Sequence, residues 1–387
     1  MNKIKVYHFH NGSGGGVLTV IKNLLKYNAG TQIENHVIYI INKKLIPHFS
    51  LPQLSGATSE QVFYYSPRWN FYYTCNRLAK LLPDDKSVIA AHDWLELGMV
   101  SNLGLRNPVV HFVHGDYEYY YNLSTKHEQS TDQFICISPV IYNKLCKIIL
   151  HRKTDIQYCR FPVPGIEALK KENEILKIFY CVKDITDERK QFKILPLINE
   201  KLKAGGLTVN WTIVGDGMYS EQLKTLMNQH SFISYSSSIP NDEVIKLLNG
   251  QHLFILPSLE EGFPVSAVEA MKAGVVPLIT DWNGATVELI IQNETAYYFK
   301  PGDAEGYADT ILLLNADRKL LDKLSANAVK KANELFDPFR NTKNIEEVII
   351  KAYHSVKKQK FSCKVYGSRL DKKWIPNFVV SSIRRAI

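Results

Sequence analysis

Short apolar runs alternate with amphipathic stretches along the first part of the chain. The runs that predict buried strands lie at residues 4–9, 36–41, 61–65, 87–92, 109–114 and 134–138. Helical patterns occur between several of them, for example at 17–27, 70–82 and 139–150. Strands that alternate with helices in this way are typical of a doubly wound parallel sheet.

A break at residues 161–165 (FPVPG), followed by the charged stretch 167–174, predicts a linker. A second alternating series follows. Its expected strands are 175–182, 207–215, 232–236, 253–256 and 275–280, and its expected helices lie near 190–204, 219–229 and 241–249. After residue 303 the pattern is helical to about 356. We therefore predict an α/β fold with one domain at 1–165, a second at 174–336 and a helical segment at 337–387.

The stretch 253–280 predicts one βαβ unit, in which a helix from about 264 to 273 joins two buried strands. Pro264 suits the first turn of that helix, and Gly274 suits its end. The loop before the helix follows the carboxyl end of a strand, where open α/β sheets bind ligands. The amide end of the helix attracts phosphate, while Glu261 and Glu269 offer acceptors for hydroxyl groups. The alternative is that both acids are solvated on an ordinary surface helix.

Residues 261–277 read E-G-F-P-V-S-A-V-E-A-M-K-A-G-V-V-P, which resembles the signature of the family-4 nucleotide-sugar glycosyltransferases, also called glycosyl transferases group 1. The resemblance implies that Glu261 contacts the hydroxyls of the donor sugar and that Glu269 holds the ribose. The loop residues Gly262, Phe263, Pro264 and Val265 would lie against the donor. The resemblance also implies the GT-B fold, in which two Rossmann-like domains face a cleft and the last helices, here 337–387, return to the first domain.

Two further groups of residues fit a diphosphate donor. Lys183 follows an expected strand, and Arg189 and Lys190 open the next helix, so these cations can clamp a diphosphate and neutralise the leaving nucleotide. The family usually has Gly-Arg where Val182 and Lys183 stand here, which leaves solvated loop cations as the alternative. In the first domain, the resemblance places the glycine-rich loop with Gly15 and Gly16 near the donor phosphates and the acceptor; the alternative is a plain tight turn.

His114 ends the expected strand at 109–114. The family resemblance implies that this histidine reaches the donor sugar from the opposite wall of the cleft, and we expect His92 to be structural. The tyrosines at 117 and 119–121 follow His114 and have either an acceptor-side or a packing role. Glu288 lies where the family often has G-G-x-x-E, but Asn283 replaces the first glycine.

The composition is that of a soluble globular protein, with 45% hydrophobic and 22% charged residues. No apolar run reaches the length of a membrane span, and the N-terminus reads as a strand with no signal peptide. The six cysteines have no C-x-x-C spacing, so we expect reduced core residues and a cytoplasmic protein. We expect no metal cofactor, because no D-x-D motif appears at an expected strand end.

The formal charge of +9 is concentrated at the end of the chain: residues 357–387 contain nine Lys/Arg and one acid, Asp371. Mixed with Trp374, Phe378 and Ile383, these cations predict a peripheral contact with an anionic membrane. A helix folded back with its charges outward is the alternative. No nucleic-acid-binding module accompanies the cations, so nucleic acid is not an expected partner.

The favoured function is transfer of a hexose-like sugar from a UDP- or GDP-sugar to a hydroxyl of a glycan or lipid-linked glycan acceptor. Retention of anomeric configuration is implied by the family resemblance. A glycosidase also uses two carboxylates, but it needs no diphosphate clamp. An oxidoreductase is disfavoured because no G-x-G-x-x-G precedes an acid. A catalytically silent partner that binds sugar nucleotides remains the main alternative.

Overall fold

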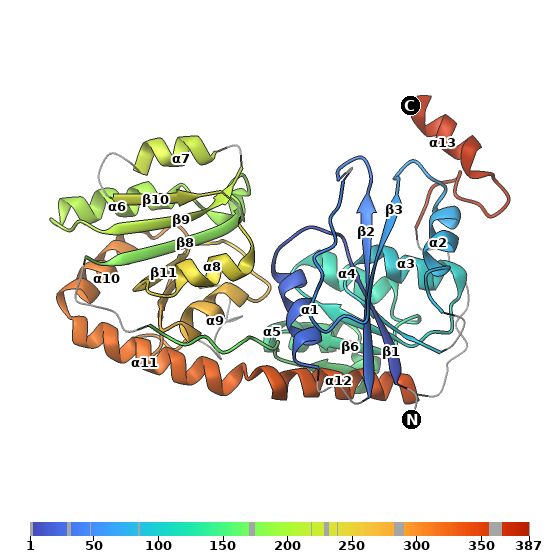
Figure 1. The fold of residues 1–387 in the computed structure, drawn as a ribbon, viewed down its shortest axis with the longest axis horizontal. Helices are drawn as coiled ribbons and strands as arrows, with labels where there is room; N and C mark the ends of the chain where they lie inside the picture. The colour runs from blue at the N-terminus through green and yellow to red at the C-terminus, as the bar shows by residue number, and fades with distance from the viewer. Residues whose placement is uncertain are drawn as a thin grey trace. The chain divides into compact units, whose positions relative to one another are not determined.

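The computed structural model describes residues 3–28, 32–46, 48–83, 86–169, 175–217, 219–227, 232–237, 239–281, 290–355 and 366–386. The chain forms two compact units (Figure 1). The first contains Met1–Pro162 and Pro338–Ile387, and the second contains Val163–Asp337. The C-terminal segment 338–387 therefore belongs to the first unit.

The first unit is built on a seven-stranded parallel sheet with the order β3-β2-β1-β4-β5-β6-β7. Its strands are β1 (Ile4–His10), β2 (Ile33–Asn42), β3 (Ser59–Tyr65), β4 (Val88–Ala91), β5 (Val109–Val113), β6 (Gln133–Cys136) and β7 (Ile156–Tyr158). Most strand residues are buried, because helices cover both faces of a parallel sheet. The strand order reverses between β1 and β4, which makes their carboxyl ends the topological switch point of this sheet.

The helices of the first unit begin at recognisable caps. Asn70 caps α2, Ser138 caps α5, and Asp93 forms a capping box with Glu96 at the start of α3. The sequence gives no periodic signal for α3, because its residues are buried on nearly every side and show no single apolar face. The helices of this unit are α1 (Gly16–Lys26), α2 (Phe71–Ala79), α3 (Trp94–Leu103), α4 (Glu118–Lys126), α5 (Pro139–Ile148), η1 (Leu150–Asp155), α12 (Pro338–His354) and α13 (Asn377–Ala386).

The second unit has a six-stranded parallel sheet with the order β10-β9-β8-β11-β12-β13. The strands are β8 (Lys177–Asp184), β9 (Asn210–Asp216), β10 (Phe232–Ser236), β11 (Leu253–Leu256), β12 (Val276–Thr280) and β13 (Tyr297–Phe299). The helices are η2 (Glu188–Lys190), α6 (Ile194–Ala204), α7 (Ser220–Met227), α8 (Asn241–Leu248), α9 (Val265–Lys272), α10 (Ala304–Ala316) and α11 (Arg318–Leu335). The switch point of this sheet lies between β8 and β11.

The predicted βαβ unit is present as β11, α9 and β12, with β11 and β12 paired in parallel. Gly274 follows the helix with a φ of 71°, a left-handed conformation that favours glycine. The two Rossmann-like sheets together confirm the predicted fold class. Among the described helices, none is both long and apolar enough to cross a bilayer.

Candidate functional site

The switch point of the second sheet brings together two side chains that the sequence singled out. Lys190 ends η2, Glu261 lies in the loop after β11, and the Lys190 Nζ is 2.7 Å from the Glu261 Oε1. Both side chains keep some contact with solvent, at 25% and 16% exposure. The backbone ties the same two loops together, because the Leu259 amide donates to the Arg189 carbonyl at 2.7 Å. A cation and a carboxylate are thus held side by side at the edge where this fold class binds ligands.

Glu269 lies on α9 and is only 4% exposed. Its Oε1 accepts a hydrogen bond of 3.3 Å from the Asn241 side chain at the start of α8. Burial and the nearby Glu269 charge raise the pKa of Cys181 on β8 to about 12. Glu269 therefore lies next to the switch point. Of the two acids, Glu269 is the more deeply buried and Glu261 is nearer to solvent.

The other predicted cations are oriented differently. The Arg189 guanidinium makes two hydrogen bonds, of 2.9 and 2.8 Å, to Asp187 in its own turn, and these hydrogen bonds lower the pKa of Asp187. Lys183 is exposed near the end of β8. Lys190 thus pairs with the predicted site acid Glu261, whereas Arg189 pairs with Asp187.

The loop that leads into α9 is held in place by packing against the second unit. The Phe263 ring packs against Phe336, with ring centroids 5.3 Å apart. Gly262 and Pro264 are buried, and the Val265 amide donates to the Phe263 carbonyl at 3.0 Å. The start of the helix is therefore fixed to the body of the second unit before any ligand arrives.

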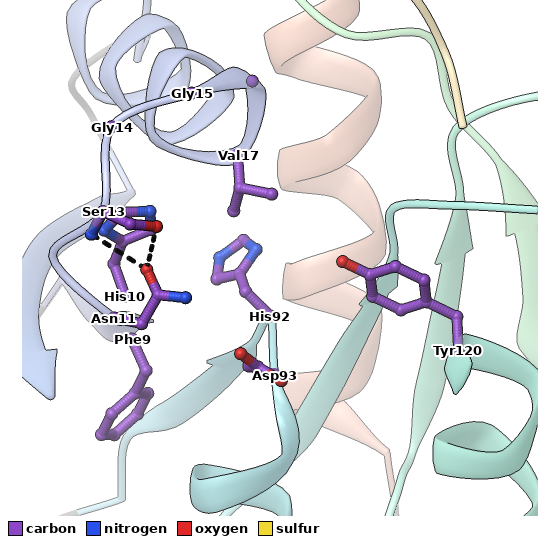
Figure 2. Close-up of a pocket in the computed structure, with 11 residues that line it drawn as sticks. Phe9, His10, Asn11, Ser13, Gly14, Gly15, Val17, His92, Asp93 and Tyr120 are labelled. Atoms are coloured by element: carbon purple, nitrogen blue, oxygen red, sulfur yellow. Dashed lines mark hydrogen bonds between the residues drawn. The ribbon is translucent and has the colours of Figure 1, made fainter. Parts of the chain in front are cut away.

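A small pocket of about 130 Å³ lies at the switch point of the first sheet. Figure 2 shows the His92 ring and the Tyr120 hydroxyl directed into it. Gly15, with a φ of 119°, immediately precedes α1, so this turn requires glycine. The predicted glycine-rich loop thus forms one wall. The lining residues are Phe9, His10, Asn11, Ser13, Gly14, Gly15, Gly16, Val17, His92, Asp93 and Tyr120.

Three histidines next to this pocket form a series of contacts that connects β1 with the ends of β4 and β5. The His8 Nδ1 lies 3.2 Å from the His92 Nε2, and the His92 Nδ1 lies 2.8 Å from the His114 Nε2. Asn35 is the last member of this hydrogen-bonded series, and its Oδ1 lies 3.2 Å from the His8 Nε2. Burial lowers the pKa of His8 to about 4 and that of His114 to about 3, so both rings are neutral at physiological pH.

The interpretation of His114 as functional and His92 as structural separates two residues that the structure connects. His92 lines the pocket and its Nδ1 is the hydrogen-bond partner of His114. The sequence contained a usable signal, since His92 and Asp93 directly follow β4 beside the switch point. The tyrosines after His114 belong to α4 and its N-cap: Tyr120 lines the pocket, and the Tyr119 hydroxyl donates to Asp93.

Gly217, Asn283 and Glu288 complete the description of the second unit. Gly217, after β9, has a φ of 136°, and a Cβ there would lie 2.6 Å from the Thr186 hydroxyl, so this turn needs glycine for its geometry. Asn283 and Glu288 lie outside the described residues.

Comparison with known proteins gives the same family as the signature. Residues 166–331 match the family described as Glycosyl transferases group 1. A curated relative from Campylobacter jejuni, N,N'-diacetylbacillosaminyl-diphospho-undecaprenol alpha-1,3-N-acetylgalactosaminyltransferase, is 36% identical over 90 residues. That match covers 23% of this chain and 24% of the relative, so it spans about a quarter of each protein.

Solved structures resemble the chain over a greater length. Anabaena HepE in complex with UDP and glucose has a TM-score of 0.70 at 14% identity, covering 90% of this chain and 100% of HepE. The lipopolysaccharide outer core galactosyltransferase WaaB has a TM-score of 0.66 at 15% identity, covering 90% of this chain and 99% of WaaB. At these identities the likeness concerns the fold. The signature at 261–277 lies inside the region of the second unit, residues 166–331, that matches the glycosyl transferases group 1 family.

Proposed function

We propose that this protein transfers a hexose-like sugar from a nucleotide diphosphate donor to a hydroxyl of a glycan or lipid-linked glycan, with retention of anomeric configuration. The observation that carries the proposal is the pairing of Lys190 with Glu261 at the switch point, with Glu269 buried nearby. A sugar nucleotide presents a diphosphate and two sets of hydroxyls, which need a cation and two separate acceptors.

Each residue has a role that follows from its place. Glu261 is the more exposed acid and accepts hydrogen bonds from the donor sugar, whereas the buried Glu269 accepts from the ribose. Lys190 then turns toward the diphosphate and stabilises the negative charge that grows on the leaving nucleotide. Lys183 and Arg189 add positive charge at the same edge, and these cations together do the work of a metal ion. His114, held by His92, is a neutral hydrogen-bonding group for the sugar.

The relatives support a class of donor and a class of acceptor. HepE was solved with UDP and glucose, which supports a UDP-sugar here; a GDP-sugar is the alternative. The Campylobacter jejuni relative is named for a diphospho-undecaprenol substrate, which supports a lipid-linked acceptor. Such an acceptor would place the protein in cell-surface glycan assembly, at the inner face of the cytoplasmic membrane.

The test uses the purified full-length chain and a panel of UDP- and GDP-sugars. We expect one donor to raise the unfolding temperature and to be hydrolysed slowly without acceptor. Glu261→Ala should lower turnover at least about a hundredfold, because it removes a charged contact in the transition state. Glu260→Ala is the matched control: Glu260 is the adjacent acid and is exposed, so its loss should leave turnover unchanged.

The outcomes separate the alternatives. A donor that stabilises the protein but is neither hydrolysed nor transferred identifies a silent sugar-nucleotide-binding partner. Hydrolysis of a glycan with no stabilisation by any nucleotide identifies a glycosidase. Normal turnover in Glu261→Ala would remove the assignment of this site.

A further inference from the structure

The C-terminal helix α13 is seated firmly on the first unit, next to α2 (Figure 1). Asp371, which is 2% exposed, accepts a hydrogen bond of 2.6 Å from the Phe71 amide at the start of α2 and pairs with Arg384 at 2.6 Å. The Asn377 side chain accepts from the Asn70 amide at 2.8 Å. The segment is therefore a fixed part of the surface in the described structure.

The orientation of α13 differs in part from that of a folded-back helix with all its charges outward and its large apolar side chains inward. Val380 is fully buried, and Arg384 points inward to Asp371 and to the Trp69 carbonyl. The large apolar side chains face outward instead: Phe378 is 72% exposed, and Trp374, just before the helix, is 75% exposed. A segment that exposes Trp374 and Phe378 while Arg384 turns toward the body of the unit is not arranged for water alone.

Aromatic and basic residues of α2 and the preceding turn continue this surface. Lys373 lies 5.6 Å from the ring centre of Tyr72, and the Arg77 guanidinium lies 5.1 Å from that of Trp69. Tyr73 is 39% exposed beside Trp69. We name the surface formed by residues 68–80 and 372–385 the aromatic–basic face.

The charge on the two segments is strongly one-sided. Residues 61–83 contain three Lys/Arg and no acid, and residues 366–386 contain five Lys/Arg and one acid. That acid is Asp371, which is buried against Arg384. Because Asp371 is paired with Arg384, no other acid of these two segments offsets the positive charge of the exposed Lys372, Lys373 and Arg385.

We propose that the aromatic–basic face binds the surface of an anionic lipid bilayer. Tryptophan and tyrosine prefer the boundary between headgroups and acyl chains, and lysine and arginine are attracted to anionic lipid. Trp374 and Phe378 insert into the boundary, while Lys372, Lys373 and Arg385 lie at the level of the headgroups. This proposal rests on the proposed function. The contact would bring the protein to the bilayer surface at which a lipid-linked acceptor is presented.

The test measures binding of the full-length protein to vesicles without donor or acceptor. Vesicles of phosphatidylcholine alone are compared with vesicles that also contain phosphatidylglycerol. We expect binding to the anionic vesicles only, weakening as salt is raised. The variant K372Q/K373Q/W374S should reduce the affinity at least about tenfold, because each cation near an anionic surface contributes on the order of a fivefold factor.

The matched control is K147Q/L150S/K153Q. These residues are also two exposed lysines and an exposed apolar residue, Leu150 at 68%. They lie around η1, beside β7 at the opposite edge of the same sheet from β3. The control should bind anionic vesicles like the unchanged protein, and both variants should keep the same unfolding temperature.

A second variant, W374S/F378S, separates insertion from charge and should weaken binding while leaving its salt dependence in place. The membrane contact is overturned if the protein binds neither vesicle, if it binds neutral and anionic vesicles equally, or if both triple variants lose affinity alike. Transfer to a water-soluble acceptor analogue should be unchanged in all tail variants, so failure of the membrane contact and failure of the proposed chemistry are read separately.

Discussion

The two units share a parallel sheet and a switch point but fill that place with opposite chemistry. In the first unit the strand ends carry neutral, buried histidines, of which His92 is hydrogen-bonded on both sides. In the second unit the same place holds Glu261, Glu269 and Lys190. The fold therefore decides where a site lies, and the residues at the strand ends decide what it binds.

The buried histidines make the first unit sensitive to acid. Burial lowers the pKa of His8 and His111 from 6.5 to about 4, and that of His127 to about 3. Among the described residues of the second unit, His252 is the only histidine.

The largest effect we expect is selective acid unfolding of the first unit. The pKa of these histidines is lower in the folded than in the unfolded state, so the unfolded state binds more protons between pH 6.5 and about 4. Stability is complete above pH 6.5 and falls as the pH drops through this window, by up to about 3 kcal/mol for each of His8 and His111. Hydrogen exchange, corrected for intrinsic rates, should show the first unit opening first as the pH is lowered.

His111→Leu sharpens this measurement. His111 is fully buried on β5, and leucine does not titrate, so the variant should lose less stability between neutral and acid pH than the unchanged protein. His151→Leu, at an exposed histidine, is the control and should leave the pH dependence unchanged. Opening of both units at the same pH would contradict the contrast between them.

The second expected effect concerns Lys272, at the end of α9. This side chain is 1% exposed, and its Nζ lies 2.6 Å from the Val163 carbonyl and 2.8 Å from the Phe336 carbonyl. Val163 is the first residue of the second unit, and Phe336 lies just before its last residue, Asp337. One buried ammonium group thus ties the signature helix to both ends of the unit.

Lys272→Met should destabilise the second unit by about 2 kcal/mol at neutral pH, because two buried carbonyls lose a charged donor. Burial lowers the pKa of Lys272 from 10.5 to about 8, so the unchanged unit should gain stability as the pH rises through this range, and the variant should not. Urea unfolding followed in the second unit measures both. Lys323→Met, at an exposed lysine of α11, should change neither; a gain of stability in Lys272→Met at neutral pH would refute the role.

Most strands could be predicted from sequence, because buried parallel strands are continuous apolar runs. The three-residue strands β7 and β13 were too short to give such a signal. The histidine network could not be predicted, since His8 and His92 are 84 residues apart and meet only because β1 pairs with β4. The burial of Lys272 could not be predicted either, because a lysine near a helix end usually reaches solvent.

The smallest effect we expect is at Asn241, which donates to Glu269 at 3.3 Å. This hydrogen bond is long and therefore weak. Asn241 orients the Glu269 carboxylate, which is already held in place because Glu269 is buried on α9. Asn241→Ala should weaken nucleotide binding about threefold, close to the free energy of one weak hydrogen bond, and leave the maximal rate nearly unchanged. Isothermal titration with UDP and GDP measures the change in nucleotide affinity, with Asn249→Ala at the other end of α8 as control.

Because Asn241 acts through Glu269, the same substitution in a Glu269→Gln background should have a smaller effect. An equal loss in both backgrounds would mean that Asn241 contacts the nucleotide itself, and the second unit would then have a polar contact to its ligand on α8 as well as on α9.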